Sequence, residues 1–350
     1  MKTSFCRCKN RLFFGNYTCL GCGSAVGRCN SCSVLSSFSP VANGGLVCDQ
    51  CKVNAQGCKN RACGLCNVFV SRGNESLCRW CEFTRLTADL SRPENLARCI
   101  ELERAKRRSL LELELLQFPP FLADVGRTHP LTFQFLENKV DNNSQTEIVY
   151  TGHENGTITI NVLEADSVHR EKTRVALREP QRTLIGHMRH EIGHYLDWAL
   201  ASRIAFDEYK VHFGDPGAID YEAAKDSYYE HGPKDDWPDR HVSAYASMHP
   251  WEDFAETVNS YLDLMALAVT ANDQEISQVD ISPKTPAATI VNQVLSIAII
   301  VSEFNQDIGL PPLLPELLSP TVMKKLAFIH SLRSEEMVGR IEQLTAEVRS

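Results

Sequence analysis

The nine residues "RHEIGHYLD", Arg189 to Asp197, decide how this sequence is interpreted. Apolar residues around them recur at helical spacing, which predicts a helix through the segment. On a helix, residues four apart share one face, so the imidazoles of His190 and His194 could bind one Zn²⁺ ion. Glu191 would lie at the rim of that face, within reach of a water, and Gly193 would let another backbone or a substrate approach closely. Because such a pattern can arise by chance, motifs elsewhere in the chain are needed to establish whether it predicts a zinc site.

Length and composition limit the possible domain number and class of protein. The chain has 350 residues, which is long enough for two or three domains, and its apolar fraction of 43% is ordinary for a globular protein. A net charge of −8 argues against a nucleic-acid binder. No segment has the apolar length of a membrane span, and residues 289–304 are expected to form a buried helix. The N-terminus lacks an apolar secretory signal, so a cytoplasmic location is expected.

The cysteines are unevenly distributed. Thirteen of the fourteen lie between Cys6 and Cys81, and only Cys99 follows them. This change in composition predicts three parts, namely a zinc-ribbon region over residues 1–84, a connecting helix over 85–118 and a second domain over 119–350.

Closely spaced cysteine pairs predict three Cys₄ zinc sites. Such sites have no open position, so they stabilise structure and do not catalyse. A disulfide framework is the less favoured alternative because no secretory signal is present. Cys58 and Cys99 are left over, although pairs can exchange partners and Cys58 could replace Cys63. The expected ligands are Cys6, Cys8, Cys19 and Cys22; Cys29, Cys32, Cys48 and Cys51; and Cys63, Cys66, Cys78 and Cys81.

The helix after the ribbon region is expected to be a spacer between that region and the second domain. Basic residues such as Arg28 and Arg61 make the ribbon region locally basic, and a protein partner is weakly favoured for this surface over a purely solvated one. Ser91 is the expected N-cap of the connecting helix. Within that helix, "RAKRR" (residues 104–108) is expected to form a solvated face, and Cys99 to pack as a small apolar residue.

The second domain should combine a hairpin with metal-binding helices. Residues 149–150 and 157–162 are expected to be strands joined by the turn "HENG" (residues 153–156). A third metal ligand is needed, and the metzincin class is excluded because Asp197 and Leu200 stand where that class has Gly and His. Glu252 and Glu256 share one face of a later predicted helix, and either could reach the metal.

Longer stretches carry a family resemblance. "RHEIGHYLD", "SAYASMHPWEDFAET" (residues 243–257) and the start "FCRCKNRLFFGNYTCLGCG" (residues 5–23) resemble the bacterial zinc-binding metallopeptidase family with an N-terminal zinc ribbon. The resemblance implies an α+β fold, in which zinc ribbons precede a mainly helical, zincin-like domain with a small β-sheet. The later motif is also similar, more distantly, to lethal-factor-type peptidases, which implies Glu252 as the third ligand, Tyr245 as an assisting hydroxyl and one catalytic zinc.

The function that the resemblance implies is hydrolysis of a peptide or protein substrate. Glu191 would be the general base for a zinc-activated water, and Tyr245 would stabilise the oxyanion. Asp197, Glu256 and Asp253, in that order, are candidates to orient the imidazoles. The alternative is an inert zinc-binding scaffold or regulator that acts through its ribbons. The presence of Glu191 and Tyr245 favours the enzyme, because zinc binding alone requires neither.

Overall fold

A computed structural model describes residues 2–41, 44–73, 77–119, 121–140, 146–176, 182–313 and 317–349. The fold is α+β and divides into two compact units. The first unit comprises residues 1–110, 132–151 and 159–184, and the second comprises residues 111–131, 152–158 and 185–350. The cysteine-rich region lies in the first unit, whereas "RHEIGHYLD" and the helix that follows Pro250 lie in the second.

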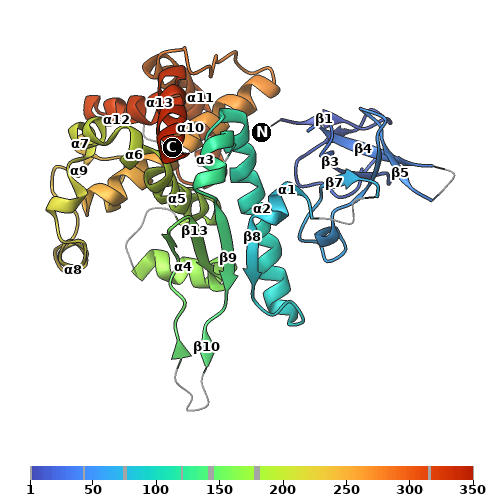
Figure 1. The fold of residues 1–350 in the computed structure, drawn as a ribbon, viewed down its shortest axis with the longest axis horizontal. Coiled ribbons are helices and arrows are strands. Elements are labelled where there is room, and N and C mark those ends of the chain that lie inside the picture. Colours follow the sequence, from blue (N-terminus) through green and yellow to red (C-terminus); the bar gives the residue numbers. More distant parts are fainter. Residues whose placement is uncertain are drawn as a thin grey trace. The chain divides into compact units, whose positions relative to one another are not determined.

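The cysteine-rich part of the first unit is built on short antiparallel strands (blue in Figure 1). β1 (Ser4–Phe5) pairs with β2 (Arg11–Leu12). A five-stranded sheet follows in sequence order, with β3 (Ala25–Arg28), β4 (Leu35–Pro40), β5 (Leu46–Cys48), β6 (Asn54–Gly57) and β7 (Phe69–Ser71). Its small core holds the stacked rings of Phe38 and Phe69, whose centroids are 3.7 Å apart. The predicted basic surface is partly structural, because Arg28 and Arg61 lie over the rings of Trp80 and Phe69.

Helix α2 (Pro93–Leu116) corrects the predicted solvated face. In "RAKRR", Lys106 and Arg107 are buried. Lys106 pairs with Glu103 of the same helix at 2.8 Å and also donates to the hydroxyl of Thr84, and Arg107 donates to the Oδ1 of Asn67 at 2.7 Å. The contacts with Thr84 and Asn67 anchor α2 within the first unit. Ser91 does not cap the helix but donates to Asp89 at 2.7 Å. Cys99 is buried in α2, as predicted.

A second sheet follows the order β12–β13–β9–β8. The parallel pairing of β8 (Thr84–Thr87) with β9 (Thr132–Leu136) requires a crossover, which includes α2. The predicted hairpin is shifted along the chain. Residues 149–150 are not a strand; β12 (Gly152–Glu154) and β13 (Thr157–Asn161) are joined by a turn at Asn155 and Gly156, which both have positive φ. Val162 begins a 3₁₀ helix (Val162–Ala165) rather than ending the strand.

The remaining elements of the first unit are short. They are the 3₁₀ helix Lys59–Arg61, α1 (Arg79–Glu82), the paired strands β10 (Lys139–Val140) and β11 (Thr146–Glu147), and α4 (Ser167–Ala176).

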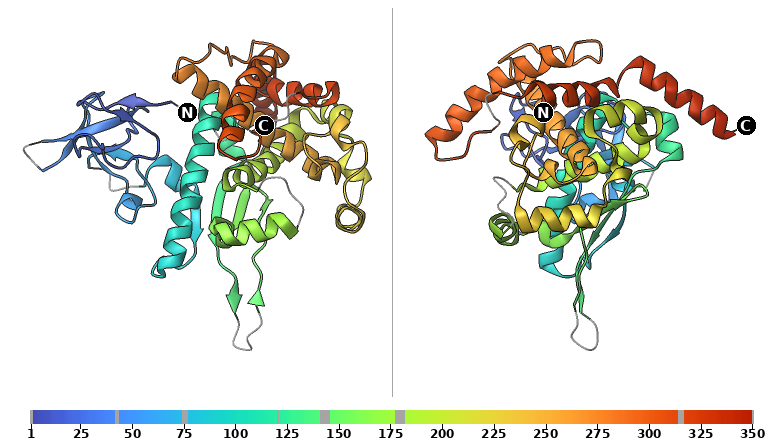
Figure 2. Two further views of the ribbon diagram at one scale, coloured as in Figure 1. Left: turned by 180° about the vertical axis from the view of Figure 1, so that it is seen from behind. Right: turned by 90° about the vertical axis from the view of Figure 1, so that its left-hand side faces the viewer.

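The second unit is mostly helical, and α10 (Pro250–Asp273) packs against α7 (Phe206–Phe213), α11 (Ala287–Asp307) and α12 (Pro320–Ser331). Figure 2 shows these helices in colours from yellow-green to red. The metal-motif helix α5 (Leu184–Leu196) continues into a π-helical turn (Asp197–Ala201). The other elements are α3 (Ala123–Thr128), α6 (Ser202–Ile204), α7 (Phe206–Phe213), the 3₁₀ helix Pro216–Ala218, α8 (Tyr221–His231), α9 (Trp237–Arg240), the 3₁₀ helix Tyr245–Ser247, α11 (Ala287–Asp307), α12 (Pro320–Ser331) and α13 (Glu335–Arg349).

Helix α11 is the described helix that is long and apolar enough to cross a membrane by length and composition alone. The expectation that no segment reaches this length is therefore too strict. The helix nevertheless packs against α10 and α12, and eight of its residues are buried, including Ile290 and Val294. The prediction of a buried helix for residues 289–304 is therefore correct for one face only, because Ile299, Ile300 and Phe304 are exposed.

Candidate metal centre

Two helices of the second unit approach each other closely at one glycine. A Cβ added to Gly193 of α5 would lie 2.7 Å from the Cα and 2.9 Å from the carbonyl oxygen of Ala255 in α10. The prediction that Gly193 admits another backbone is thus confirmed, and that backbone is α10. The close approach brings His190 and His194, which are one turn apart on α5, next to the residues of α10 on either side of Ala255.

The structure brings His190, His194 and Glu252 together as a group that could hold a metal ion. The Nε2 atoms of the two histidines are 3.1 Å apart. Oε2 of Glu252 lies 3.1 Å from Nε2 of His190 and 3.5 Å from Nε2 of His194. Nitrogen and oxygen ligands at 2.0–2.2 Å from zinc would be separated by about 3.3–3.6 Å in a tetrahedron. The three donors therefore fit a tetrahedral zinc site that has one position left open.

Burial and neighbouring charges shift the pKa values of His190 and Glu252 in opposite directions. Burial lowers the pKa of His190, but contact with Glu252 and Glu256 outweighs it and raises that pKa well above its ordinary value. Burial raises the pKa of Glu252, yet the charge of His194 and the contact with His190 hold it well below its ordinary value. Without a metal, these two groups therefore form an ion pair. A bound cation would take the place of the proton on Nε2 of His190 and face the ionised carboxylate of Glu252.

Glu256 orients the first histidine rather than joining the ligand group. Its Oε1 accepts a hydrogen bond of 2.7 Å from Nδ1 of His190, and its Oε2 accepts one of 2.7 Å from the hydroxyl of Ser243. A carboxylate on Nδ1 keeps the proton there and leaves Nε2 to face the metal position. The order of preference for this role was wrong, because Asp197 accepts from Ser202, and Asp253 pairs with Lys325.

The two predicted catalytic groups lie in different elements. Glu191 is buried in α5, between the two histidines in sequence. Tyr245 begins a 3₁₀ helix, and its ring centroid is 6.0 Å from that of His190. Burial, the charge of Glu252 and contact with Tyr221 raise the pKa of Tyr245. Its hydroxyl therefore stays protonated and can donate a hydrogen bond.

Sequence reasoning missed a second tyrosine at the metal centre. The hydroxyl of Tyr221, in α8, donates to Oε1 of Glu252 at 2.9 Å. Tyr221 lies 31 residues before Glu252 in a polar segment, and no spacing rule predicts this contact. His249 lies close by in sequence and is buried, and its Nδ1 caps α10 by accepting from the backbone of Trp251 at 3.1 Å.

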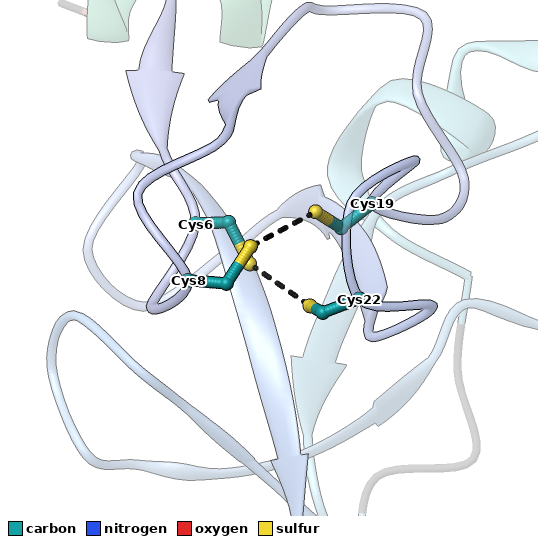
Figure 3. A group of neighbouring side chains, drawn as sticks. All are labelled: Cys6, Cys8, Cys19 and Cys22. Carbon is teal, nitrogen blue, oxygen red and sulfur yellow. Dashed lines mark hydrogen bonds between the residues drawn. The ribbon is translucent and has the colours of Figure 1, made fainter.

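The first two cysteine groups of the first unit contain the residues predicted for them. Figure 3 shows the first group, in which Cys6 and Cys8 face Cys19 and Cys22. Its Sγ atoms are 3.6 Å apart between Cys6 and Cys22 and again between Cys8 and Cys19. In the second group, Cys29 and Cys51 are 3.8 Å apart. Thiolates at 2.3 Å from zinc would be separated by about 3.8 Å, whereas a disulfide requires about 2.0 Å. Both groups therefore fit zinc.

The third cysteine group differs from its prediction by one residue. It consists of Cys58, Cys66, Cys78 and Cys81, all buried, with 3.6 Å between the Sγ atoms of Cys66 and Cys78. Cys63 is exposed, and its Sγ donates to the carbonyl oxygen of Asn60 at 3.3 Å. The 3₁₀ helix Lys59–Arg61 separates the two cysteines, so Cys58 alone joins the group. The open alternative, in which Cys58 replaces Cys63, is the arrangement found.

Comparisons with known proteins match two consecutive parts of the chain. Residues 95–332 match the family model described as "Putative zinc-binding metallo-peptidase", and residues 4–92 match a zinc-ribbon domain. Uncharacterized proteins of Mycobacterium tuberculosis and Mycobacterium bovis are 35% identical over 337 residues, and the match covers 94% of each chain. No solved structure matches significantly.

Proposed function

Since this chain belongs to the zinc-binding metallopeptidase family that carries a zinc ribbon, we propose that its second unit hydrolyses peptide bonds at the centre formed by His190, His194 and Glu252. One observation carries the proposal. Two imidazole nitrogens and one carboxylate oxygen, from two separate helices, lie 3.1 to 3.5 Å from one another, and the helix that carries the two histidines also carries the buried Glu191.

Each residue of the centre has a separate role in the proposed reaction. A zinc ion held by the three donors would supply a Lewis acid that activates water and polarises the substrate carbonyl. Glu191 takes the proton of the attacking water and passes it to the leaving amine as the peptide bond breaks. The Tyr245 hydroxyl donates to the oxygen that gains negative charge. Glu256 holds the Nδ1 proton of His190 throughout.

Replacing Glu191 by Gln tests this proposal. The substitution removes the base but none of the three metal donors, so zinc content should stay at the wild-type value while hydrolysis falls by at least about 100-fold. The measurement is the appearance of new N-termini in a proteome-derived peptide library. A suitable control is Glu335→Gln, which makes the same change at an exposed ion pair with Lys284.

The alternative is an inert zinc-binding scaffold. In that case, neither wild type nor Glu191→Gln would give cleavage products above background, while both would retain zinc. That result would overturn the peptidase and leave zinc binding intact.

A further inference from the structure

The two oxygens of Glu252 have different surroundings. Oε2 faces both histidine Nε2 atoms, at 3.1 and 3.5 Å. Oε1 accepts the hydrogen bond of 2.9 Å from Tyr221. The carboxylate is almost completely buried, so this phenol replaces the water that would otherwise solvate Oε1.

Local structure fixes the position of Tyr221. Asp220 caps α8 by accepting from the backbone of Ala223 at 2.8 Å, which makes Tyr221 the first residue of the helix. The Nε2 of His249 lies 3.3 Å from the carbonyl oxygen of Ile219, two residues before Tyr221. His249 also caps α10, so the start of α8 is tied to the start of the helix that carries Glu252.

The role of Tyr221 is not that of a core residue. Helix α8 contributes no buried residue to the second unit. The Tyr221 ring instead meets the rings of His249 and Trp251, with centroid distances of 5.3 and 5.6 Å.

We propose that Tyr221 is a positioning residue that holds Oε1 of Glu252, so that this carboxylate binds the metal through Oε2 alone and one coordination position stays open. The inference rests on the proposed zinc centre and adds to it. A carboxylate whose two oxygens are both free can bind a cation through both of them. Such binding would occupy space that the attacking water and the substrate carbonyl need.

The test replaces Tyr221 by Phe and reports on coordination directly. Zinc at the open centre is exchanged for Co²⁺ while the ribbon sites keep zinc, and the visible absorption spectrum is recorded. Four-coordinate Co²⁺ absorbs strongly, and higher coordination weakens the bands. We expect Tyr221→Phe to weaken the bands and to lower kcat for library peptides about 10- to 100-fold. Tyr150→Phe, which removes an exposed hydroxyl, should match wild type in both measurements.

The outcomes separate this inference from the proposed function. If Tyr221→Phe keeps three ribbon zincs but gives the wild-type Co²⁺ spectrum, Tyr221 does not control the binding mode, and the peptidase proposal is unaffected. If wild type takes up no Co²⁺ beyond a His190→Ala, His194→Ala double variant, the metal centre itself is wrong, and the inference falls with it.

Discussion

Among individual side chains, Glu256 offers a direct test of how the metal centre is organised. Its carboxylate accepts the Nδ1 proton of His190 at 2.7 Å. Replacing Glu256 by Leu removes the acceptor, so the imidazole is free to rotate and to change tautomer. We expect zinc affinity at the centre to fall about 10- to 100-fold, as measured by competition with a chromophoric chelator. Glu256→Gln keeps an acceptor without the charge and should lose less, whereas a Leu variant with wild-type affinity would contradict this role.

His153 should make stability depend on pH. Burial and the charge of His194 lower the pKa of His153 to about 4, whereas an unfolded His has a pKa of about 6.5. Between these values the unfolded chain binds a proton that the folded chain does not. The free energy of unfolding should therefore decrease as pH falls from about 6.5 towards 4, by at most about 1.4 kcal/mol per pH unit from this group.

Urea unfolding of wild type and His153→Gln at equal zinc concentration measures that contribution. The difference in free energy between the two proteins should change with pH in this window and be constant above about pH 7. A difference that is constant throughout would assign the pH dependence to other groups.

The residues of the centre differ in how well the sequence predicts them. His190, Glu191 and His194 lie within one helical turn, where spacing alone determines which side chains share a face. Glu252 and Tyr245 came from family resemblance, because nothing local relates a residue to another about 60 positions away. Tyr221 and Ser243 were missed for the same reason. Their hydroxyls matter only through contacts that the tertiary fold creates.

At the level of secondary structure, the contact of α5 with α10 controls the spacing of the ligands. Gly193→Ala would place a Cβ 2.7 Å from the Cα of Ala255, so the helices must separate. Overpacking of this kind costs about 1–3 kcal/mol, against which a better helix propensity returns at most about 1 kcal/mol. We expect a lower free energy of unfolding and weaker zinc binding, because Glu252 moves away from the two histidines.

Gly339→Ala provides the matched control. Gly339 lies in α13, and a Cβ added there would meet nothing within 4 Å. The same substitution should therefore be neutral or stabilising by up to about 1 kcal/mol. Thermal unfolding of both variants measures these changes in stability. Equal effects at the two glycines would show that the close contact of α5 with α10 is not needed for stability.

Predictions for individual helices and strands were wrong where tertiary contacts, rather than hydrophobic periodicity, determine the structure. The "RAKRR" run has the charge of a solvated face, but Lys106 and Arg107 are buried because Glu103 and Asn67 pair with them. Sequence alone does not show which charges will find buried partners. The hairpin was predicted correctly in kind and misplaced in its first strand, because the turn residues Asn155 and Gly156, rather than the apolar pair at 149–150, fix the register.

Across the whole chain, composition predicts the cysteine-rich start, whereas the compact units of the fold are not continuous segments of the sequence. The first unit includes residues 132–151 and 159–184, far from the cysteines in sequence. Strand β9 from this later segment pairs in parallel with β8, and a parallel partner is always distant along the chain. A boundary drawn from composition cannot include such a segment.

Zinc content tests the arrangement of metal sites in the intact molecule. Four groups could hold a metal, and only the one formed by His190, His194 and Glu252 lacks a fourth protein ligand among the described residues. We therefore expect four zincs per chain by elemental analysis, of which a chelator removes one readily and three slowly. Substitutions of Cys58 and Cys63 then distinguish the third zinc site in the structure from the site that cysteine spacing predicts. Cys58→Ser should lower the slowly released zinc from three to two, because a buried ligand is lost, whereas Cys63→Ser should leave it at three. The opposite result, with zinc lost only from Cys63→Ser, would restore the regular C-x-x-C pairing and overturn the third site as the structure shows it.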